Sequence, residues 1–271
     1  MQTHPFDAAL ALQPADGGAT GHLQGAYGNM IGPFGGIVAA AMLKAVLTQA
    51  QCQGTPVAMT VNFASALADA DFFISTKLSR ATRTTQHWSL ELSQGEQITT
   101  TASLVMAVRA QTWTDTELSM PVLPGPAALP MLDVSAYPAW TRRYAMRIIA
   151  GGLSPDLNAL ESSQSLTQLW VRDEPPRPLD YPALMALSDI FFPRVFVRRQ
   201  RLMPAGTVSM TTYFHADAAA LQRQGERELL ACARAQRFHQ GFFDQSAELW
   251  SAAGELLVTS HQIVYFKDAS R

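Results

Sequence analysis

A short segment of this chain occurs twice, far apart in the sequence. Residues 57–63 (VAMTVNF) resemble residues 208–214 (VSMTTYF), with Val, Met, Thr and Phe at the same spacing. Each copy follows an apolar helical pattern, and each is followed by three further strand-like runs. Such self-similarity indicates one supersecondary unit present twice, so the two halves are expected to share a fold.

The first half reads as one helix followed by four strands. The helix is expected at residues 34–48, where the sequence is rich in alanine and almost uncharged, as a buried helix should be. Gly32 and Pro33 open it, and Gly54 lies beyond its end. The strand-like runs are residues 57–65, 72–80, 84–92 and 97–109.

The second half has the same order of elements. Asp180 is expected to cap the helix with Pro182 in its first turn. Pro193 disfavours helix at Phe192, so the helix is expected to end there. The strand-like runs are residues 207–215, 227–237, 240–250 and 255–267, with a hairpin turn at Ala253-Gly254.

A proline-rich stretch separates the two halves. Residues 121–138 contain five prolines and are typical of a linker that crosses the surface. We therefore divide the chain into an N-terminal repeat (1–120), the linker (121–138) and a C-terminal repeat (139–271). Each repeat is an α+β unit in which an antiparallel sheet wraps one long buried helix. This is the hotdog arrangement, and two copies predict a double hotdog.

Composition excludes several classes of protein. The 271 residues are 48% hydrophobic and 15% charged, enough to bury a sizeable core, and the net charge of −2 gives no electrostatic case for nucleic acid. The longest apolar stretch, residues 37–47, contains Lys44 and is too short to span a bilayer. The first twelve residues lack the basic start of a secretory signal. We expect a cytoplasmic protein that binds neither nucleic acid nor membrane, with Cys52 and Cys232 as free thiols.

The two halves differ at an acidic position, and such differences help to locate chemistry. The first helix has no acidic residue, whereas the second is expected to carry Asp189 in its last turn, among apolar neighbours. A carboxylate there is costly unless it is paired or used, and the negative end of the helix dipole opposes it. Asp189 therefore either serves catalysis, or caps a nearby loop or pairs with Arg194.

The final strands of the two halves also differ. Aligning residues 101–109 with residues 259–267 makes Gln262 the counterpart of Leu104. Strand alternation places Gln262 on an otherwise apolar face, so its amide is either a satisfied core group or a donor and acceptor facing a cavity. Thr207 is the counterpart of Pro56. Strand alternation places Thr207 on the polar side of its strand, so the periodicity does not support a place for Thr207 in the site.

Several short segments, taken in order, resemble the acyl-CoA thioesterase II family and related double hotdog thioesterases. They are Phe34-Gly35-Gly36, Trp170-Val171-Arg172, Ser188-Asp189, Gly206-Thr207 followed by Phe214-His215, and Ser260-His261-Gln262. They extend over most of the chain, from about residue 22 to residue 267. No single motif is strong, but their joint order and spacing are specific. The linker and the N-terminal segment depart from the family pattern, so the length of the acyl chain does not carry over.

The resemblance implies that Asp189, Thr207 and Gln262 are the catalytic residues of an acyl-CoA hydrolase. Asp189 would be the general base, and the other two would hold the water. Apolar surroundings would raise the pKa of Asp189, whereas hydrogen bonds to the carboxylate would lower it. No metal or other cofactor is expected, since the sequence lacks the HExxH pattern. It also lacks the GxSxG pattern of a serine hydrolase.

The start of the first helix is expected to bind substrate through Phe34, Gly35 and Gly36. Backbone N–H groups at a helix N-terminus could meet the oxyanion, and glycines permit close approach. Close packing of helix on sheet explains the Gly-Gly pair equally well. A basic cluster (Arg194, Arg198, Arg199 and Arg201) is either a solvated face or a site for the phosphates of coenzyme A.

Two further expectations concern assembly and activity. Family analogy alone suggests a homo-oligomer. The alternative to an enzyme is a non-catalytic acyl-CoA-binding or regulatory hotdog protein, and release of free thiol from a panel of acyl-CoAs would distinguish the two.

Overall fold

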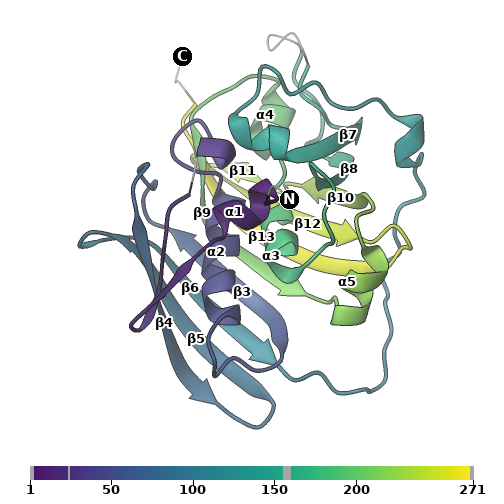
Figure 1. Ribbon diagram of the computed structural model, residues 1–271. Coiled ribbons are helices and arrows are strands. Elements are labelled where there is room, and N and C mark those ends of the chain that lie inside the picture. The colour runs from purple at the N-terminus through teal and green to yellow at the C-terminus, as the bar shows by residue number, and fades with distance from the viewer. Residues whose placement is uncertain (1–2, 24, 155–159, 269–271) are drawn as a thin grey trace.

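One antiparallel sheet curves around two buried helices, α2 and α3 (Figure 1). The computed structural model describes residues 3–23, 25–154 and 160–268. The strands are β1 (Gln13–Ala15), β2 (Gly18–Gly21), β3 (Thr55–Phe63), β4 (Phe72–Ala81), β5 (Thr85–Gln94), β6 (Gln97–Ala107), β7 (Tyr144–Ala150), β8 (Thr167–Asp173), β9 (Ala205–Phe214), β10 (Leu229–Arg234), β11 (Phe238–His239), β12 (Phe242–Trp250) and β13 (Leu256–Phe266). The helices are α1 (Pro5–Ala9), α2 (Gly35–Leu47), α3 (Tyr181–Leu187), α4 (Arg194–Arg199) and α5 (Ala218–Gln224). Short 3-10 helices are η1 (Gly25–Tyr27), η2 (Pro126–Ala128) and η3 (Ala139–Arg143).

The order of the strands shows the same unit twice. The sheet runs β1-β2-β4-β5-β6-β3-β9-β13-β12-β10-β8-β7, with β11 beside β12. Outward from the centre, the first half therefore reads β3, β6, β5, β4, β2, and the second half reads β9, β13, β12, β10, β8. The two halves match strand for strand. In the sequence, each helix follows the outermost of these strands (β2 or β8) and precedes the innermost one (β3 or β9). The predicted α+β double hotdog is confirmed.

The two halves meet at β3 and β9, and their register fixes a pseudo-twofold axis. Thr60 pairs directly with Thr211, and their hydroxyl oxygens are 2.9 Å apart. Residues on either side pair in reverse order, so Met59 and Met210 occupy equivalent positions about this axis. The alignment predicted from the repeated segment is thus the alignment that the sheet adopts.

Helix α2 is buried along its whole length, which explains its composition. Ala39, Ala40 and Ala41 are all inaccessible to solvent, since the helix lies between the sheet and α3. Small side chains let two helices approach closely. One close approach is at Gly36, where an added Cβ would lie 2.5 Å from the carbonyl oxygen of Ala186 in α3. The close contact at this glycine is therefore between helix and helix, rather than between helix and sheet.

The second helix begins as predicted but ends early. The Asp180 carboxylate accepts a hydrogen bond of 2.8 Å from the Ala183 N–H, as a helix cap does. The helix stops at Leu187, not at Phe192. Beyond it the chain turns, and Pro193 opens a separate helix, α4, rather than ending the first one. The expectation of one long helix in each half therefore holds only for the first half.

The linker follows the outside of the second half, where Figure 1 shows it crossing from β6 towards β7. Trp170 of β8 donates a hydrogen bond of 2.8 Å from its indole nitrogen to the carbonyl oxygen of Pro124. Leu123 and Leu129 pack on the same outer apolar cluster. No helix within the described parts of the chain is long and apolar enough to cross a membrane.

Candidate active site

The three residues singled out as catalytic form one hydrogen-bonded chain. Thr207 of β9 donates from Oγ1 to Oε1 of Gln262 in β13, at 3.2 Å. Gln262 donates from Nε2 to Oδ1 of Asp189, at 2.9 Å. This orientation of the amide satisfies both neighbours, because an ionised carboxylate can only accept. Residues far apart in the sequence are thereby brought into contact beside the N-terminus of α2.

Thr207 reaches this site because β9 contains a β-bulge. Thr207 pairs with Val264 and Ser209 pairs with Ile263, so Val208 is left without a partner on β13. The extra residue reverses the alternation of side chains, and Thr207 points to the inner face. Simple alternation placed it on the polar side, and that interpretation was wrong for this reason.

The first half keeps the same positions but not the same chemistry. Leu104 pairs with Met59, as Gln262 pairs with Met210. The alignment of the final strands is therefore confirmed by the register. Pro56, the counterpart of Thr207, likewise precedes a bulge in β3. The equivalents of Gln262 and Thr207 in the first half are thus apolar, and the polar chain belongs to the second half.

Asp189 lies beyond the end of α3 and not in its last turn, as the sequence had suggested. Its carboxylate instead meets the N-terminus of the other helix, α2, where the nearby Gly36 N–H lowers its pKa. A Cβ added to Gly35 would lie 2.8 Å from Oδ2. The N-terminus of a helix carries a partial positive charge, which stabilises an anion. Asp189 therefore lies at the positive end of the α2 dipole, where we had expected it to lie at the negative end of the dipole of its own helix.

Opposing effects set the pKa of Asp189. Burial raises its pKa from the ordinary value to about 7, and hydrogen bonds from Gln262 and from the Gly36 N–H lower it. Desolvation is the largest of these effects, which decides the question that the sequence left open. The residue as a whole keeps partial contact with solvent, whereas protein surrounds the carboxylate. A carboxyl group with a pKa near neutrality is suited to accept a proton from water.

The structural alternative for Asp189, a pair with Arg194, is wrong. Arg194 is fully buried, and its guanidinium donates to the carbonyl oxygen of Ser165 at 2.9 Å and to the hydroxyl of Thr167 at 2.6 Å. A third hydrogen bond goes to the Phe192 carbonyl. None of the ion pairs among the described residues involves Asp189.

The rest of the arginine cluster is largely neutralised. Arg198 and Arg199 contact the carboxylate of Glu161, and Arg199 and Arg201 contact that of Asp268. The solvated face predicted for this cluster is therefore limited to three arginines, since Arg194 is in the core. Their carboxylate partners would compete with phosphate groups.

Phe34 caps α2 and belongs to an aromatic wall behind the site. Its ring is 2% exposed and stacks on Trp140, with ring centroids 4.4 Å apart. In this conformation Phe34 supports the start of α2 rather than facing open solvent. Sequence reasoning missed Met210, whose Sδ lies 3.3 Å from Nε2 of Gln262. Its place in the repeat was the signal that could have found it.

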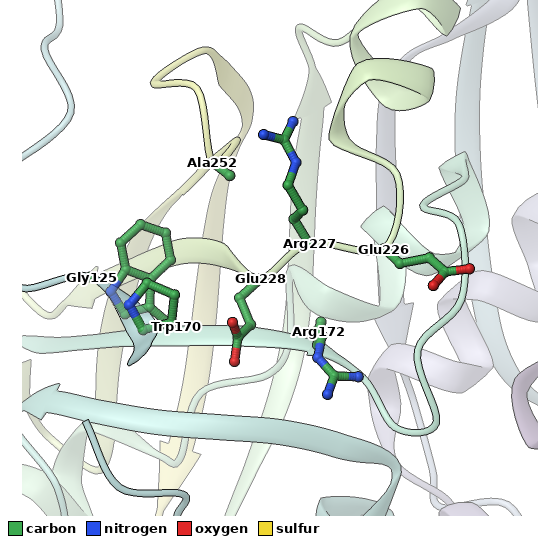
Figure 2. Close-up of a pocket in the computed structure, with 8 residues that line it drawn as sticks. Gly125, Trp170, Arg172, Glu226, Arg227, Glu228 and Ala252 are labelled. Carbon is green, nitrogen blue, oxygen red and sulfur yellow. The ribbon is translucent and has the colours of Figure 1, made fainter. Parts of the chain in front are cut away.

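A surface pocket of about 460 Å³ lies elsewhere, between the linker and the turn that leads into β10 (Figure 2). Its charged side chains are partly compensated: Arg147 pairs with Glu228 at 2.8 Å, and Arg172 pairs with Glu174 at 3.2 Å. It includes none of the three residues of the hydrogen-bonded chain. The candidate site is instead the chain at Asp189, where a buried carboxyl group with a raised pKa is hydrogen-bonded to Gln262. No group of three or more His, Cys, Asp or Glu side chains within the described residues is arranged to hold a metal ion.

Fold and site together define a double hotdog protein with a carboxylate, an amide and a hydroxyl in one chain of hydrogen bonds. The family model of the acyl-CoA thioesterase C-terminal domain matches residues 115–266, and that of the acyl-CoA thioesterase N-terminal domain matches residues 25–110. The chain belongs to the acyl-CoA thioesterase family and is a thioester hydrolase.

Solved structures share the fold of this chain. A hot-dog-fold protein of unknown function from Alicyclobacillus acidocaldarius is 43% identical over 99% of this chain and 100% of its own, with a TM-score of 0.94. A putative thioesterase II from Thermobifida fusca YX (18% identity, 99% of each chain, TM-score 0.83) shares the fold. So does the acyl-CoA thioesterase II TesB2 from Mycobacterium marinum (17%, 98% of each chain, TM-score 0.76). No curated protein matches this chain significantly.

Proposed function

We propose that the protein hydrolyses acyl-CoA thioesters to the free acid and coenzyme A, with a water activated by Asp189. The observation that carries this proposal is the chain from Thr207 through Gln262 to Asp189, which ends at a carboxyl group whose pKa is raised to about 7. Gln262 donates a hydrogen bond to Oδ1 of Asp189. Oδ2 of Asp189 faces Gly35, whose lack of a side chain leaves room for a water. We place the attacking water on that side.

The chemical steps conserve every proton. Asp189 takes a proton from the water, and the hydroxide forms a bond to the thioester carbonyl carbon. The C–S bond then breaks, and the proton passes to the departing thiolate. The Gly36 N–H acts on the carboxylate of Asp189, so we assign the oxyanion to the Gly35 N–H at the first turn of α2. Thr207 and Gln262 orient the base and the water and transfer no proton themselves.

An activity panel tests the function directly. Free thiol released from acetyl-, medium-chain, long-chain and aromatic acyl-CoAs is measured with the purified protein. We expect multiple turnovers with at least one class. Tight binding of acyl-CoAs without thiol release would favour the non-catalytic binding protein instead.

We also propose that the protein is located in the cytoplasm, takes part in fatty acid metabolism and forms homo-oligomers. A monomeric mass by light scattering at micromolar concentration would contradict the last. We further propose that the N-terminal repeat ends at residue 120 and that the linker ends at residue 138.

The pH dependence of turnover should report the base. Asp189 acts only when ionised, and its pKa is about 7. We therefore expect kcat/KM to fall roughly tenfold for each pH unit below about 7 and to level off above it. The measurement is kcat/KM from pH 5 to pH 9 with one acyl-CoA. An acid limb centred near pH 4, the ordinary value for a carboxyl group, would contradict the proposed environment of Asp189.

Removing a water-orienting group should cost less than removing the base. We expect Thr207→Val and Gln262→Ala each to lower kcat by up to roughly 10²-fold, the scale of a misplaced reacting group. Thr211→Val is the matched control, because Thr211 lies on the same strand opposite the exposed His261. Steady-state kinetics on all three variants decide the point. Equal losses for Thr207→Val and Thr211→Val would show a general effect of the strand.

A further inference from the structure

Three buried polar side chains lie outside the proposed active site and have unpartnered atoms. They are Tyr27, Tyr144 and Asp173, which are 1%, 3% and 4% exposed. Both tyrosine hydroxyls and Oδ1 of Asp173 lack a hydrogen-bond partner among the residues that the structure describes. A buried polar atom left in this way is costly, so three in one place call for a physical explanation.

The fold brings these three side chains together from distant parts of the chain. Tyr144 opens β7 and pairs directly with Asp173, the last residue of β8. Tyr27 ends η1, and its ring meets that of Tyr144 edge to face, with centroids 6.3 Å apart. Phe6 of α1 packs on Tyr27 in the same manner at 6.2 Å. The cluster is therefore part of the contact between the N-terminal segment, residues 5–34, and the second half, where Arg177 links Asp7 of α1 to Asp180, the cap of α3.

Charge in this contact is unbalanced. Arg177 lies 2.8 Å from Asp7 of α1, 2.6 Å from Asp180 and 3.9 Å from Asp173. One guanidinium therefore serves three carboxyl groups. The side chains of Asp7 and Asp180 are 48% and 42% exposed, so water can solvate them, whereas the side chain of Asp173 is 3% exposed. An ionised Asp173 would be a buried charge without a partner of its own.

Neighbouring charged groups correct this imbalance only in part. Arg172 lowers the pKa of Asp173, but its guanidinium pairs with Glu174 at 3.2 Å. Arg143 lowers the pKa of Tyr27, and Asp189 raises that of Tyr144.

We propose that Asp173, together with Tyr27 and Tyr144, forms a buried proton-binding site whose occupancy decides how firmly the N-terminal segment is docked. With the proton bound, Asp173 is neutral, and Arg177 joins Asp7 to Asp180. When the proton leaves for solvent, the new carboxylate competes for Arg177, and α1 loses its ion pair.

Burial is the main cause that raises the pKa of Asp173, to about 7, so this change falls near neutral pH. The folded-state pKa lies above that of an unfolded chain, about 3.9. The stabilisation that the bound proton provides is therefore complete below pH 4, declines as pH rises to about 7 and is constant above.

Docking of the N-terminal segment also bears on the start of α2, beside the proposed active site. The Tyr27 carbonyl oxygen accepts a hydrogen bond of 2.8 Å from the N–H of Phe34, the cap of α2.

The test follows hydrogen exchange of residues 5–34 in the full chain, corrected for intrinsic rates, at pH 6 and pH 8. In the wild type we expect opening of this segment to increase roughly tenfold, the change that a group of pKa 7 imposes over this interval. Asp173→Asn, which keeps the site neutral, should show no increase. Asp115→Asn is the control, because Asp115 is exposed and lies in a coil segment. An equal increase in wild type and Asp173→Asn would overturn the proposal.

A second measurement keeps the proposal testable if Asp173→Asn does not fold. Side-chain carboxyl 13C signals are titrated in an Asp189→Asn background, which removes the other aspartate with a pKa near 7. We expect one remaining aspartate to titrate near pH 7, and Asp7→Asn to move its midpoint to lower pH, because Arg177 then has one competitor fewer. The absence of an aspartate that titrates between pH 6 and pH 8 would overturn the proposal. Neither experiment depends on thioesterase activity.

Discussion

Asp189→Asn is expected to lower kcat by roughly 10²–10⁴-fold while the protein stays folded. The amide is nearly isosteric with the carboxyl group but cannot take a proton from water. Gln262 can turn its own amide over so that Oε1 accepts from the new NH2 group, with Thr207 then acting as acceptor. The contacts of the site are therefore kept while the base is lost. Steady-state hydrolysis of an acyl-CoA measures the effect.

Stability measured on the same preparation separates catalysis from structure. The wild-type pKa of Asp189 is raised to about 7, above the unfolded value of about 3.9. As pH rises from about 4 to about 7, the wild type therefore loses the part of its unfolding free energy that protonation of Asp189 supplies, and Asp189→Asn lacks this part of the loss. We expect the melting temperature of the variant, relative to wild type, to increase across this interval. A folded variant with near wild-type turnover would refute the catalytic role.

The three residues should also act as a unit. Once Asp189 is replaced by Asn, removing Gln262 as well should cost little more, because Gln262 works only by positioning the base and its water. The comparison is kcat for wild type, Asp189→Asn, Gln262→Ala and the double variant. Strictly additive losses in activation free energy would indicate that Gln262 acts independently of Asp189.

The adjacent glycines at the start of α2 should respond in opposite ways to the same substitution. For Gly36→Ala we expect the unfolding free energy to fall by about 1–3 kcal/mol, the usual cost of overpacking. The new Cβ would lie 2.5 Å from the backbone oxygen of Ala186, which cannot move without separating α2 from α3. Such a loss corresponds to a fall of about 3–10 °C in melting temperature for a chain of this size.

Gly35→Ala should instead affect activity. Its Cβ would lie 2.8 Å from Oδ2 of Asp189, which is the end of a side chain and can move aside. We expect little change in melting temperature and at least a roughly tenfold loss of kcat, because the base is displaced. The two variants serve as controls for each other, since both gain the same helix propensity of alanine over glycine. A melting temperature lowered more by Gly35→Ala than by Gly36→Ala would contradict this assignment.

The fold and much of the candidate site could be predicted from the amino-acid sequence alone. The repeat around Met59 and Met210 predicted the pseudo-twofold, because a duplicated pattern of apolar residues must bury the same faces. The aligned final strands showed Gln262 in place of Leu104, and the register of β6 and β13 agrees. Asp189 was noticeable as an acid among apolar neighbours. Each of these inferences depends on local periodicity or on comparison of the halves, which one sequence contains.

Other features depended on contacts between distant residues. The bulge at Val208 turns Thr207 inward, and its position reflects pairing with β13 rather than any local pattern. The break in the second helix lets Asp189 leave α3 and meet the N-terminus of α2. Which effect dominates the pKa of Asp189 required the actual burial of its carboxylate. These features could be established only from contacts in the folded protein, because hydrogen bonding and desolvation depend on neighbours that the order of residues along the chain does not specify.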